Sequence, residues 1–315
     1  MDKLKKLLDL IGVSGYEEMG VSNYIYDLVK PLADDVQIDG MGNVIALKKG
    51  ADPKEKIMLI TSIDQRGFIV TVKDGKALRM GAIGSYDDNL PIGQMVEFNH
   101  GARGIISSDA DEAAKVKNLY VDIIEGTADV GDIFTCCDNP YVNEDCIASG
   151  RLYARVGAYV LIQVMEQLKN NKNDVYFVFA THGEVAFRGS KTAAFAVSPQ
   201  MAITVGTVCT GDMPGSEKSN ITLDGGPAIK IKDTSILAHP RIKNGLIDSA
   251  QNLGIKYQAE VSGETSEGGV VHIAKGAVMT GGVSVPLRYK GSTTELCLIE
   301  NINNTVKLIL GSDLL

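Results

Sequence analysis

Two carboxylates stand where predicted strands of an α/β sheet come to an end. Asp64 follows one short apolar run, His182-Gly183-Glu184 follows a second, and Gly206 follows a third. In open α/β sheets, ligands bind beyond the carboxyl ends of the strands. We therefore expect these segments to face one cleft, with Asp64 and Glu184 as its candidate catalytic residues.

Asp64 and Glu184 could act together in acid–base or glycosidase chemistry, which uses two carboxyl groups flanking the scissile bond. The alternative is that both are relics of an older site, held by a neighbouring cation such as Arg155 or Arg288. Nothing in the sequence separates the pKa values of the two carboxyl groups, as an acid–base pair requires. Sugar binding is further disfavoured because the chain has no Trp, the usual large stacking surface.

Other reactive side chains fall near the same cleft or at element ends. Cys209 and His182 could form a nucleophile–base pair, but no third, orienting group is visible. The sequence therefore favours Cys209 as a small buried residue. The adjacent Cys136-Cys137 pair would strain a disulfide, so free thiols are expected. His239 precedes Pro240, at the start of a predicted helix, and is expected to cap that helix.

The elements that position these residues alternate between strand and helix. Strands are predicted at short apolar runs, and helices where apolar residues recur every three or four positions. Predicted helices cover residues 4–11, 17–32, 158–168, 188–197, 240–253 and 299–309, and predicted strands cover 36–38, 43–47, 57–60, 175–180, 201–205 and 228–231. This alternation indicates an α/β sandwich around a central sheet.

Residues 67–149 follow a different pattern. Their short apolar segments, 68–72, 95–98, 102–106, 119–123 and 132–135, are separated by Gly, Asp and Asn. Such spacing is typical of a small β-barrel or sandwich. We predict a discontinuous α/β domain made of residues 1–66 and 150–315, with a β-rich domain of residues 67–149 inserted in it.

Composition excludes several classes of function. A 44% hydrophobic and 22% charged content is ordinary for a compact globular chain of 315 residues. The net charge of −8 and the absence of a basic tract disfavour nucleic acid as a partner. No apolar run is long enough to cross a membrane, and the N-terminus lacks a signal-peptide core. Five cysteines without a C-x-x-C pair indicate reduced thiols and a cytoplasmic location.

Many segments, in order along nearly the whole chain, resemble the tetrahedral (TET-type) glutamyl and deblocking aminopeptidases, the forty-second metallopeptidase family. Some members of this family were once labelled endoglucanases. The matching segments are Gly12-Val13-Ser14-Gly15-Tyr16-Glu17, Gly42-Asn43-Val44-Ile45-Ala46, Gly81-Ala82-Ile83-Gly84, Ile92-Gly93-Gln94, residues 188–195, Gly211-Asp212-Met213-Pro214-Gly215, Gly226-Pro227-Ala228-Ile229-Lys230 and Ala238-His239-Pro240. The resemblance implies a phosphorylase/hydrolase-like sandwich with a central mixed sheet, and an inserted PDZ-like β-barrel that mediates dimerisation.

The resemblance also implies a role for each site position. The family's first metal ligand is a His two residues before an Asp; Ser62 stands in its place, and Asp64 remains. The Asp that bridges the two metals falls on Tyr153. Such a centre uses imidazole and carboxylate to hold two ions, zinc or cobalt in this family, about 3.5–4 Å apart.

The remaining positions are altered in the same way. The family's Glu-Glu pair, which supplies a general base and then a ligand, becomes Gly183-Glu184. The next Asp ligand falls on Gly206, and the last His ligand falls on Gly291. One of the five ligands is retained and the base is replaced by glycine. We therefore expect no dinuclear centre and predict no cofactor.

Three functions follow as hypotheses. The first is a catalytically silent homologue, a pseudoenzyme that binds a peptide or small ligand or serves as an assembly subunit of an active paralogue. The second is an active metal-dependent aminopeptidase with a rebuilt site. The third is a metal-free enzyme that uses Asp64, Glu184 or Cys209. The resemblance also implies a homo-oligomer, from dimers up to a dodecamer.

Overall fold

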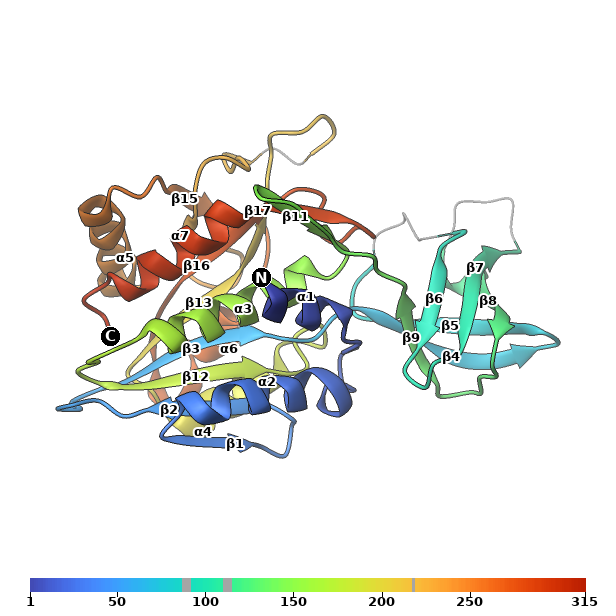
Figure 1. The fold of residues 1–315 in the computed structure, drawn as a ribbon, viewed down its shortest axis with the longest axis horizontal. Helices are drawn as coiled ribbons and strands as arrows, with labels where there is room; N and C mark the ends of the chain where they lie inside the picture. Colours follow the sequence, from blue (N-terminus) through green and yellow to red (C-terminus); the bar gives the residue numbers. More distant parts are fainter. Residues whose placement is uncertain (87–91, 110–114, 217–218) are drawn as a thin grey trace.

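The computed structural model describes residues 1–86, 92–109, 115–216 and 219–315. It contains a layered α/β part and a smaller barrel beside it, joined by extended segments (Figure 1). Within the described residues, no helix is long and apolar enough to cross a membrane.

The α/β part is built on one eight-stranded mixed sheet with the order β1-β2-β12-β3-β13-β16-β14-β15. The four central strands β12, β3, β13 and β16 are parallel, whereas β2 and β14 pair antiparallel to their inner neighbours. The strand bounds are β1 Asp35–Ile38, β2 Val44–Lys48, β3 Lys56–Ser62, β12 Asp174–Ala180, β13 Met201–Cys209, β14 Ala228–Lys232, β15 Gln258–Val261 and β16 Met279–Leu287. Because the central strands are parallel, the carboxyl ends of β12, β3, β13 and β16 lie at one edge.

Helices cover both faces of this sheet. They are α1 Asp2–Asp9, α2 Asn23–Val29, α3 Leu152–Gln167, α4 Arg188–Val197, α5 Pro240–Leu253, α6 Gly268–Val271 and α7 Ile299–Leu310, with shorter turns η1 Glu18–Ser22, η2 Lys30–Leu32 and η4 Ala274–Gly276. A further turn, η3 Val116–Asn118, lies in the barrel. Alternate residues of β3 face opposite ways: Leu59 packs in the cluster that contains α3 and α7, and Ile60 in the cluster that contains α4. The sheet is therefore buried on both sides, as a central parallel sheet requires.

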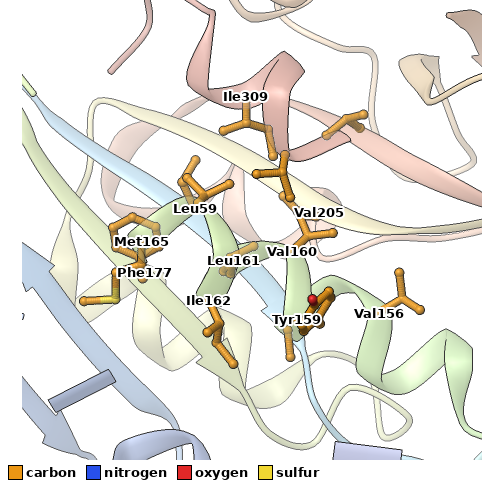
Figure 2. Packing of buried hydrophobic residues seen from close by; sticks show 14 of the residues in the cluster. Leu59, Val156, Tyr159, Val160, Leu161, Ile162, Met165, Phe177, Val205 and Ile309 are labelled. Carbon is orange, nitrogen blue, oxygen red and sulfur yellow. The ribbon is translucent and has the colours of Figure 1, made fainter. Parts of the chain in front are cut away.

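Helix α3 lies at the centre of the larger core. Val156, Val160 and Leu161 are fully buried, and Figure 2 shows α3 residues beside Leu59 and Phe177 of the sheet and Ile309 of α7. The sequence predicted one apolar face from residue 158 onward. The helix instead begins at Leu152 and is buried on nearly every side, because it lies between the sheet and α1 and α7. Its first turn therefore has a fixed position at the edge of the sheet.

The barrel is closed by six strands in the order β4-β5-β8-β7-β6-β9. Three phenylalanines, Phe68, Phe98 and Phe134, pack at its centre, with ring centroids 4.8 Å and 5.4 Å apart. The strand bounds are β4 Gly67–Asp74, β5 Ala77–Ile83, β6 Met95–Phe98, β7 Arg103–Ser108, β8 Leu119–Glu125 and β9 Ile133–Cys136. The barrel thus has its own apolar core.

A small third sheet, β10-β11-β17, lies between these parts and contains β10 Tyr141–Val142, β11 Cys146–Ser149 and β17 Glu295–Leu298. It pairs a segment that precedes α3 with the segment that follows Gly291. This pairing brings the first turn of α3 close to the 289–295 loop. Both elements carry residues that the sequence analysis assigned to the site.

Several predicted elements are confirmed. The 36–47 hairpin, the central strand at 57–60, helix 188–197 and a helix from Pro240 that ends before Gly254 are all present. His239 caps that last helix, since its Nδ1 accepts the Arg241 N–H at 3.2 Å. The predicted helix over 17–32 is confirmed as uninterrupted helical residues 18–32, in which π-helical, α-helical and 3-10 turns follow one another. Strands β5, β10, β11, β15, β16 and β17 were not predicted.

Candidate functional site

The predicted meeting of strand ends is confirmed for Asp64 and the 182–184 segment, whereas Gly206 lies inside β13, which continues to Cys209. Asp64 is buried just beyond β3, and its two carboxylate oxygens accept the backbone N–H groups of Gly183 at 2.7 Å and Glu184 at 2.8 Å. Two neighbouring strand ends are therefore joined by one carboxylate. Because both Asp64 oxygens are already hydrogen-bonded to backbone, Asp64 acts here as a structural group.

The segment that Asp64 holds is strained. His182, Ala186 and Phe187 all have a positive φ, which costs non-glycine residues about 1–3 kcal/mol each. The N–H of His182 donates to Glu17 Oε1 at 2.9 Å, so a second buried carboxylate supports the same turn. The two carboxylates together hold the strained backbone of the 182–187 turn.

Arg66 is the cation nearest to Glu184, with 3.5 Å between its Nε and Glu184 Oε2. Its guanidinium carbon lies 5.2 Å from the Tyr153 ring centroid and 6.0 Å from that of Tyr86, within cation–π range. Its backbone N–H donates to the Tyr153 hydroxyl at 2.6 Å. Arg66 is therefore positioned through both its backbone and its side chain.

Gly291 lies directly against the Arg66 guanidinium. A Cβ at this position would lie 2.9 Å from Nη2 and 3.0 Å from Nη1 of Arg66. Gly291 also has φ +83°, a conformation that side chains rarely adopt. Arg66 thus contacts or approaches Tyr153, Glu184 and Gly291, three of the five positions that the family resemblance assigned to metal ligands.

Glu295 connects two of these positions and was not singled out in the sequence. One of its oxygens accepts the Tyr153 N–H at 2.8 Å, and the other accepts the Gly291 N–H at 2.6 Å. Burial raises the pKa of Glu295 to about 8, although these two N–H groups and nearby Lys290 lower it. Glu295 therefore fixes the distance between the start of α3 and the 289–295 loop.

Glu184 is the one family ligand that the sequence retains. Burial raises its pKa to about 7; Arg66 opposes the shift and Asp64 adds to it. The sequence analysis proposed Arg155 or Arg288 as the neighbour that holds the two carboxylates, and this assignment is wrong. Arg155 donates to Ile63 O and other backbone carbonyls, and Arg288 pairs with Asp212.

The other assigned positions are Ser62, Gly183 and Gly206, and none of them makes a contact that would support catalysis. The Ser62 hydroxyl is buried without a hydrogen bond, while its backbone N–H donates to Glu267. A Cβ at Gly183 would lie 2.5 Å from Ser62 Oγ and 2.7 Å from Asp64 Oδ1. At Gly206, by contrast, a Cβ would meet nothing within 4 Å.

Cys209 and His182 do not form a dyad in the structure. The His182 ring lies 3.2 Å from Thr181 Oγ1, whereas Cys209 lies beside Glu264, which accepts its backbone N–H at 2.9 Å. Burial, with Glu264 adding to it, raises the Cys209 pKa to about 12, so the thiol stays protonated at neutral pH. All five cysteines are free thiols, as expected.

A cavity of about 590 Å³ opens beside these residues, between the barrel and the α/β part. This volume lies in the range of small-molecule sites. Residues of the site, namely Arg66, Tyr153, Cys209, Lys290 and Gly291, form part of its wall, and the barrel side contributes Tyr86, Gln94, Thr135, Cys136 and Cys137. In the described parts of the chain, no group of three or more His, Cys, Asp or Glu side chains is placed to hold a metal ion.

The model of the M42 glutamyl aminopeptidase family matches residues 42–308. The chain belongs to this family. It is 36% identical to a candidate aminopeptidase of Acetivibrio thermocellus over 323 residues, which cover 98% of this chain and 97% of that protein. The similarity therefore extends over nearly the whole chain and is not confined to the segments around the cleft.

Solved structures agree with the M42 assignment. Aminopeptidase APDkam598 from the archaeon Desulfurococcus kamchatkensis matches with a TM-score of 0.93 at 29% identity, over 98% of this chain and 93% of that one. PhTET1-12s, solved as a dodecamer, matches with a TM-score of 0.87 at 25% identity, over 98% of this chain and 97% of that one. The α/β fold with its β-barrel is thus that of M42 aminopeptidases.

Proposed function

We propose that this M42 chain is a catalytically silent homologue of the aminopeptidases, and that it binds a peptide or small ligand in the cleft. The observation that carries the proposal is the position of Arg66. Its guanidinium lies against Tyr153, Glu184 and Gly291, which stand at family metal-ligand positions. A permanent organic cation takes the place that the resemblance gives to metal ions.

The residues present do not fit a two-metal centre. At an effective dielectric constant of about 20, a single charge about 4 Å from a divalent ion repels it by roughly 8 kcal/mol. A complete structural zinc site is worth roughly 10–16 kcal/mol, and that affinity comes from several ionised ligands acting together. Here Glu184 is the one carboxylate at the assigned ligand positions, and neutral Ser62 and Tyr153 are poor ligands for zinc or cobalt. The charge of Arg66 therefore weakens a site that keeps one of its five ionisable ligands, and Glu184 alone cannot supply the affinity of a complete site.

The general base is also missing from its family position. Gly183 has no side chain, and its N–H is hydrogen-bonded to Asp64. Asp64 is buried and bonded through both oxygens, so it cannot take over the role without breaking the turn that it holds. Loss of a general base alone costs about 10²–10⁴-fold in rate. Metal-dependent peptide hydrolysis is accordingly the alternative function, and the site would have to be rebuilt to support it.

Assembly is the second part of the proposal. PhTET1-12s is a dodecamer, and we propose that this chain also forms homo-oligomers, alone or with an active paralogue. The barrel, as part of the proposed inserted PDZ-like domain 67–149, would make the dimer contact. Loss of the metal site would leave these surfaces unchanged.

The experiment is a measurement of metal content by plasma mass spectrometry after saturation with zinc or cobalt and desalting, paired with hydrolysis assays on aminoacyl anilides. The proposal expects less than one metal per chain and no metal-dependent turnover. Two metals per chain, with hydrolysis that Glu184→Ala abolishes, would refute it and establish the active aminopeptidase. Turnover that survives chelators would instead favour a metal-free enzyme.

A further inference from the structure

The side chains that line the cavity include more cations than anions, although the whole chain is acidic. Its charged members are Arg66, Arg151, Lys290 and Asp138, three cations and one anion, in a chain of net charge −8. A cavity with low-dielectric walls focuses the field of the charges that line it. A wall cation with unused hydrogen-bond donors would therefore favour an anionic ligand over a cationic one.

Two of the three cations are already neutralised by close partners. Arg151 Nη2 lies 2.5 Å from Glu97 Oε1, and Lys290 Nζ forms an ion pair with Glu264. Lys290 also donates to the Thr207 carbonyl at 2.8 Å. The Asp138 carboxylate accepts from Ser149 Oγ and from the Gly150 N–H. These groups have little hydrogen-bonding capacity left for a ligand.

Arg66 is different. Its nearest carboxylate, on Glu184, is 3.5 Å from Nε, too far for a strong hydrogen bond, and Nε is buried without a partner. Among the described residues, neither Nη atom has a hydrogen-bond acceptor, and Arg66 forms part of the cavity wall. The Tyr153 and Tyr86 rings hold the guanidinium in place. Arg66 is thus a positioned cation with unused donors at a cavity.

Resting on the proposed function, in which the cleft binds rather than hydrolyses, we propose that Arg66 binds the carboxylate of a small organic acid in this cavity. A planar guanidinium with free N–H groups matches a carboxylate in charge and hydrogen bonding. Asp138 in the cavity wall would repel a second negative charge, so the favoured ligand carries one. The tyrosine rings in the wall suit an apolar body on that ligand.

The carboxylate could belong to a free acid or to the C-terminus of a short peptide. Calorimetry on the full-length protein would therefore use two pairs of probes: phenylacetate with phenylacetamide, and glycylphenylalanine with its C-terminal amide. The proposal expects at least one carboxylate to bind about tenfold more tightly than its amide. Phenylacetate binding identifies free acids as ligands, and binding of the dipeptide alone identifies peptide termini.

Arg66→Gln removes the charge and should weaken binding of the selected carboxylate by about tenfold or more. Arg66→Lys keeps the charge but loses the planar group, and should weaken binding less. Arg241→Gln, which removes the same charge from a surface pair with Glu55, is the matched control and should change nothing. Thermal unfolding of each variant verifies that it is folded, and the amide comparison on the unmodified protein stands even if a variant is not.

Three results would overturn the inference: no carboxylate binding at millimolar concentration, equal binding of acid and amide, or full binding by folded Arg66→Gln. Tighter binding of inorganic phosphate than of either carboxylate would also overturn it. Metal content measured on the same samples separates this failure from failure of the proposed function. A metal-free protein without carboxylate selectivity refutes only the inference, whereas bound metal refutes the proposed function.

Discussion

Arg66 and Gly291 adjoin so closely that a Cβ at position 291 would lie 2.9 Å from the Arg66 guanidinium. The Arg66 side chain therefore occupies the space that a side chain at position 291 would need. Restoring a metal ligand at 291 would require Arg66 to leave, and removing Arg66 would open a space that Gly291 cannot fill. This coupling makes loss of the centre hard to reverse by single changes.

The coupling predicts the behaviour of a double-mutant cycle. Gly291→His should destabilise the protein by about 1–3 kcal/mol, because the new side chain meets Arg66 and the φ of +83° disfavours any Cβ. Gly291→His combined with Arg66→Ala should cost less than the sum of the single changes, by about 0.5–3 kcal/mol. Urea unfolding of the four proteins measures this difference. Strict additivity would show that the two positions are independent.

Substitutions at two glycines that stand at family ligand or base positions should destabilise the protein to different extents. A side chain at Gly206 enters open space, so Gly206→Asp should change stability by less than about 1 kcal/mol. Gly183→Glu should cost more, about 1–3 kcal/mol, because its Cβ would meet Ser62 and Asp64. Thermal melts of the two variants compare the costs directly. Equal melting temperatures would contradict the packing described for Gly183.

Sequence reasoning located the cleft but not what occupies it. The approach of Asp64 to Glu184 could be predicted because apolar runs and the topology of parallel sheets determine where β3 and β12 end. Arg66 was overlooked although it follows Asp64 by two positions, since its contacts with Tyr153 and Gly291 depend on segments far apart in the chain. A charged residue next to a degenerate site was the available signal.

Strand β16 was missed by sequence reasoning because of its glycines. Strand β16 contains Gly281 and Gly282, which lower strand propensity, yet it is buried in the middle of the sheet. The glycines are required there because a Cβ at Gly282 would lie 2.2 Å from Thr204 Oγ1 of the neighbouring strand. Glu295 was missed because its partners Tyr153 and Gly291 come together only through pairing of β11 with β17.

Asp64→Asn tests whether Asp64 is structural. An Asn side chain has one acceptor oxygen, so its amide would face the N–H of either Gly183 or Glu184 and leave it unpaired. We expect a loss of about 1.5–3 kcal/mol, the usual range for hydrogen bonds to a charged group. Asp122→Asn, on an exposed position of the barrel, provides a matched control. A stability equal to that of the control would show that the two backbone contacts contribute nothing.

Glu17 should make the stability of the protein fall as pH rises through the weakly acidic range. Burial, with Asp64 adding to it, raises the folded-state pKa of Glu17 from 4.5 to about 7. Below pH 4.5 the Glu17 carboxyl is protonated in both the folded and the unfolded state, so it does not lower the free energy of unfolding. Between 4.5 and 7 the unfolded chain loses the proton first, so the free energy of unfolding decreases, by at most about 3 kcal/mol in total.

Glu17→Gln should remove this dependence while keeping an acceptor for the His182 N–H. The variant should match the unmodified protein near pH 4 and be more stable above pH 7, by about 1–3 kcal/mol. Urea unfolding of both proteins at pH 5 and pH 8 measures the difference, and other titrating groups cancel in the comparison. An identical pH slope for the two proteins would mean that Glu17 is ionised in the fold. The 182–187 turn would then be held by two charged carboxylates.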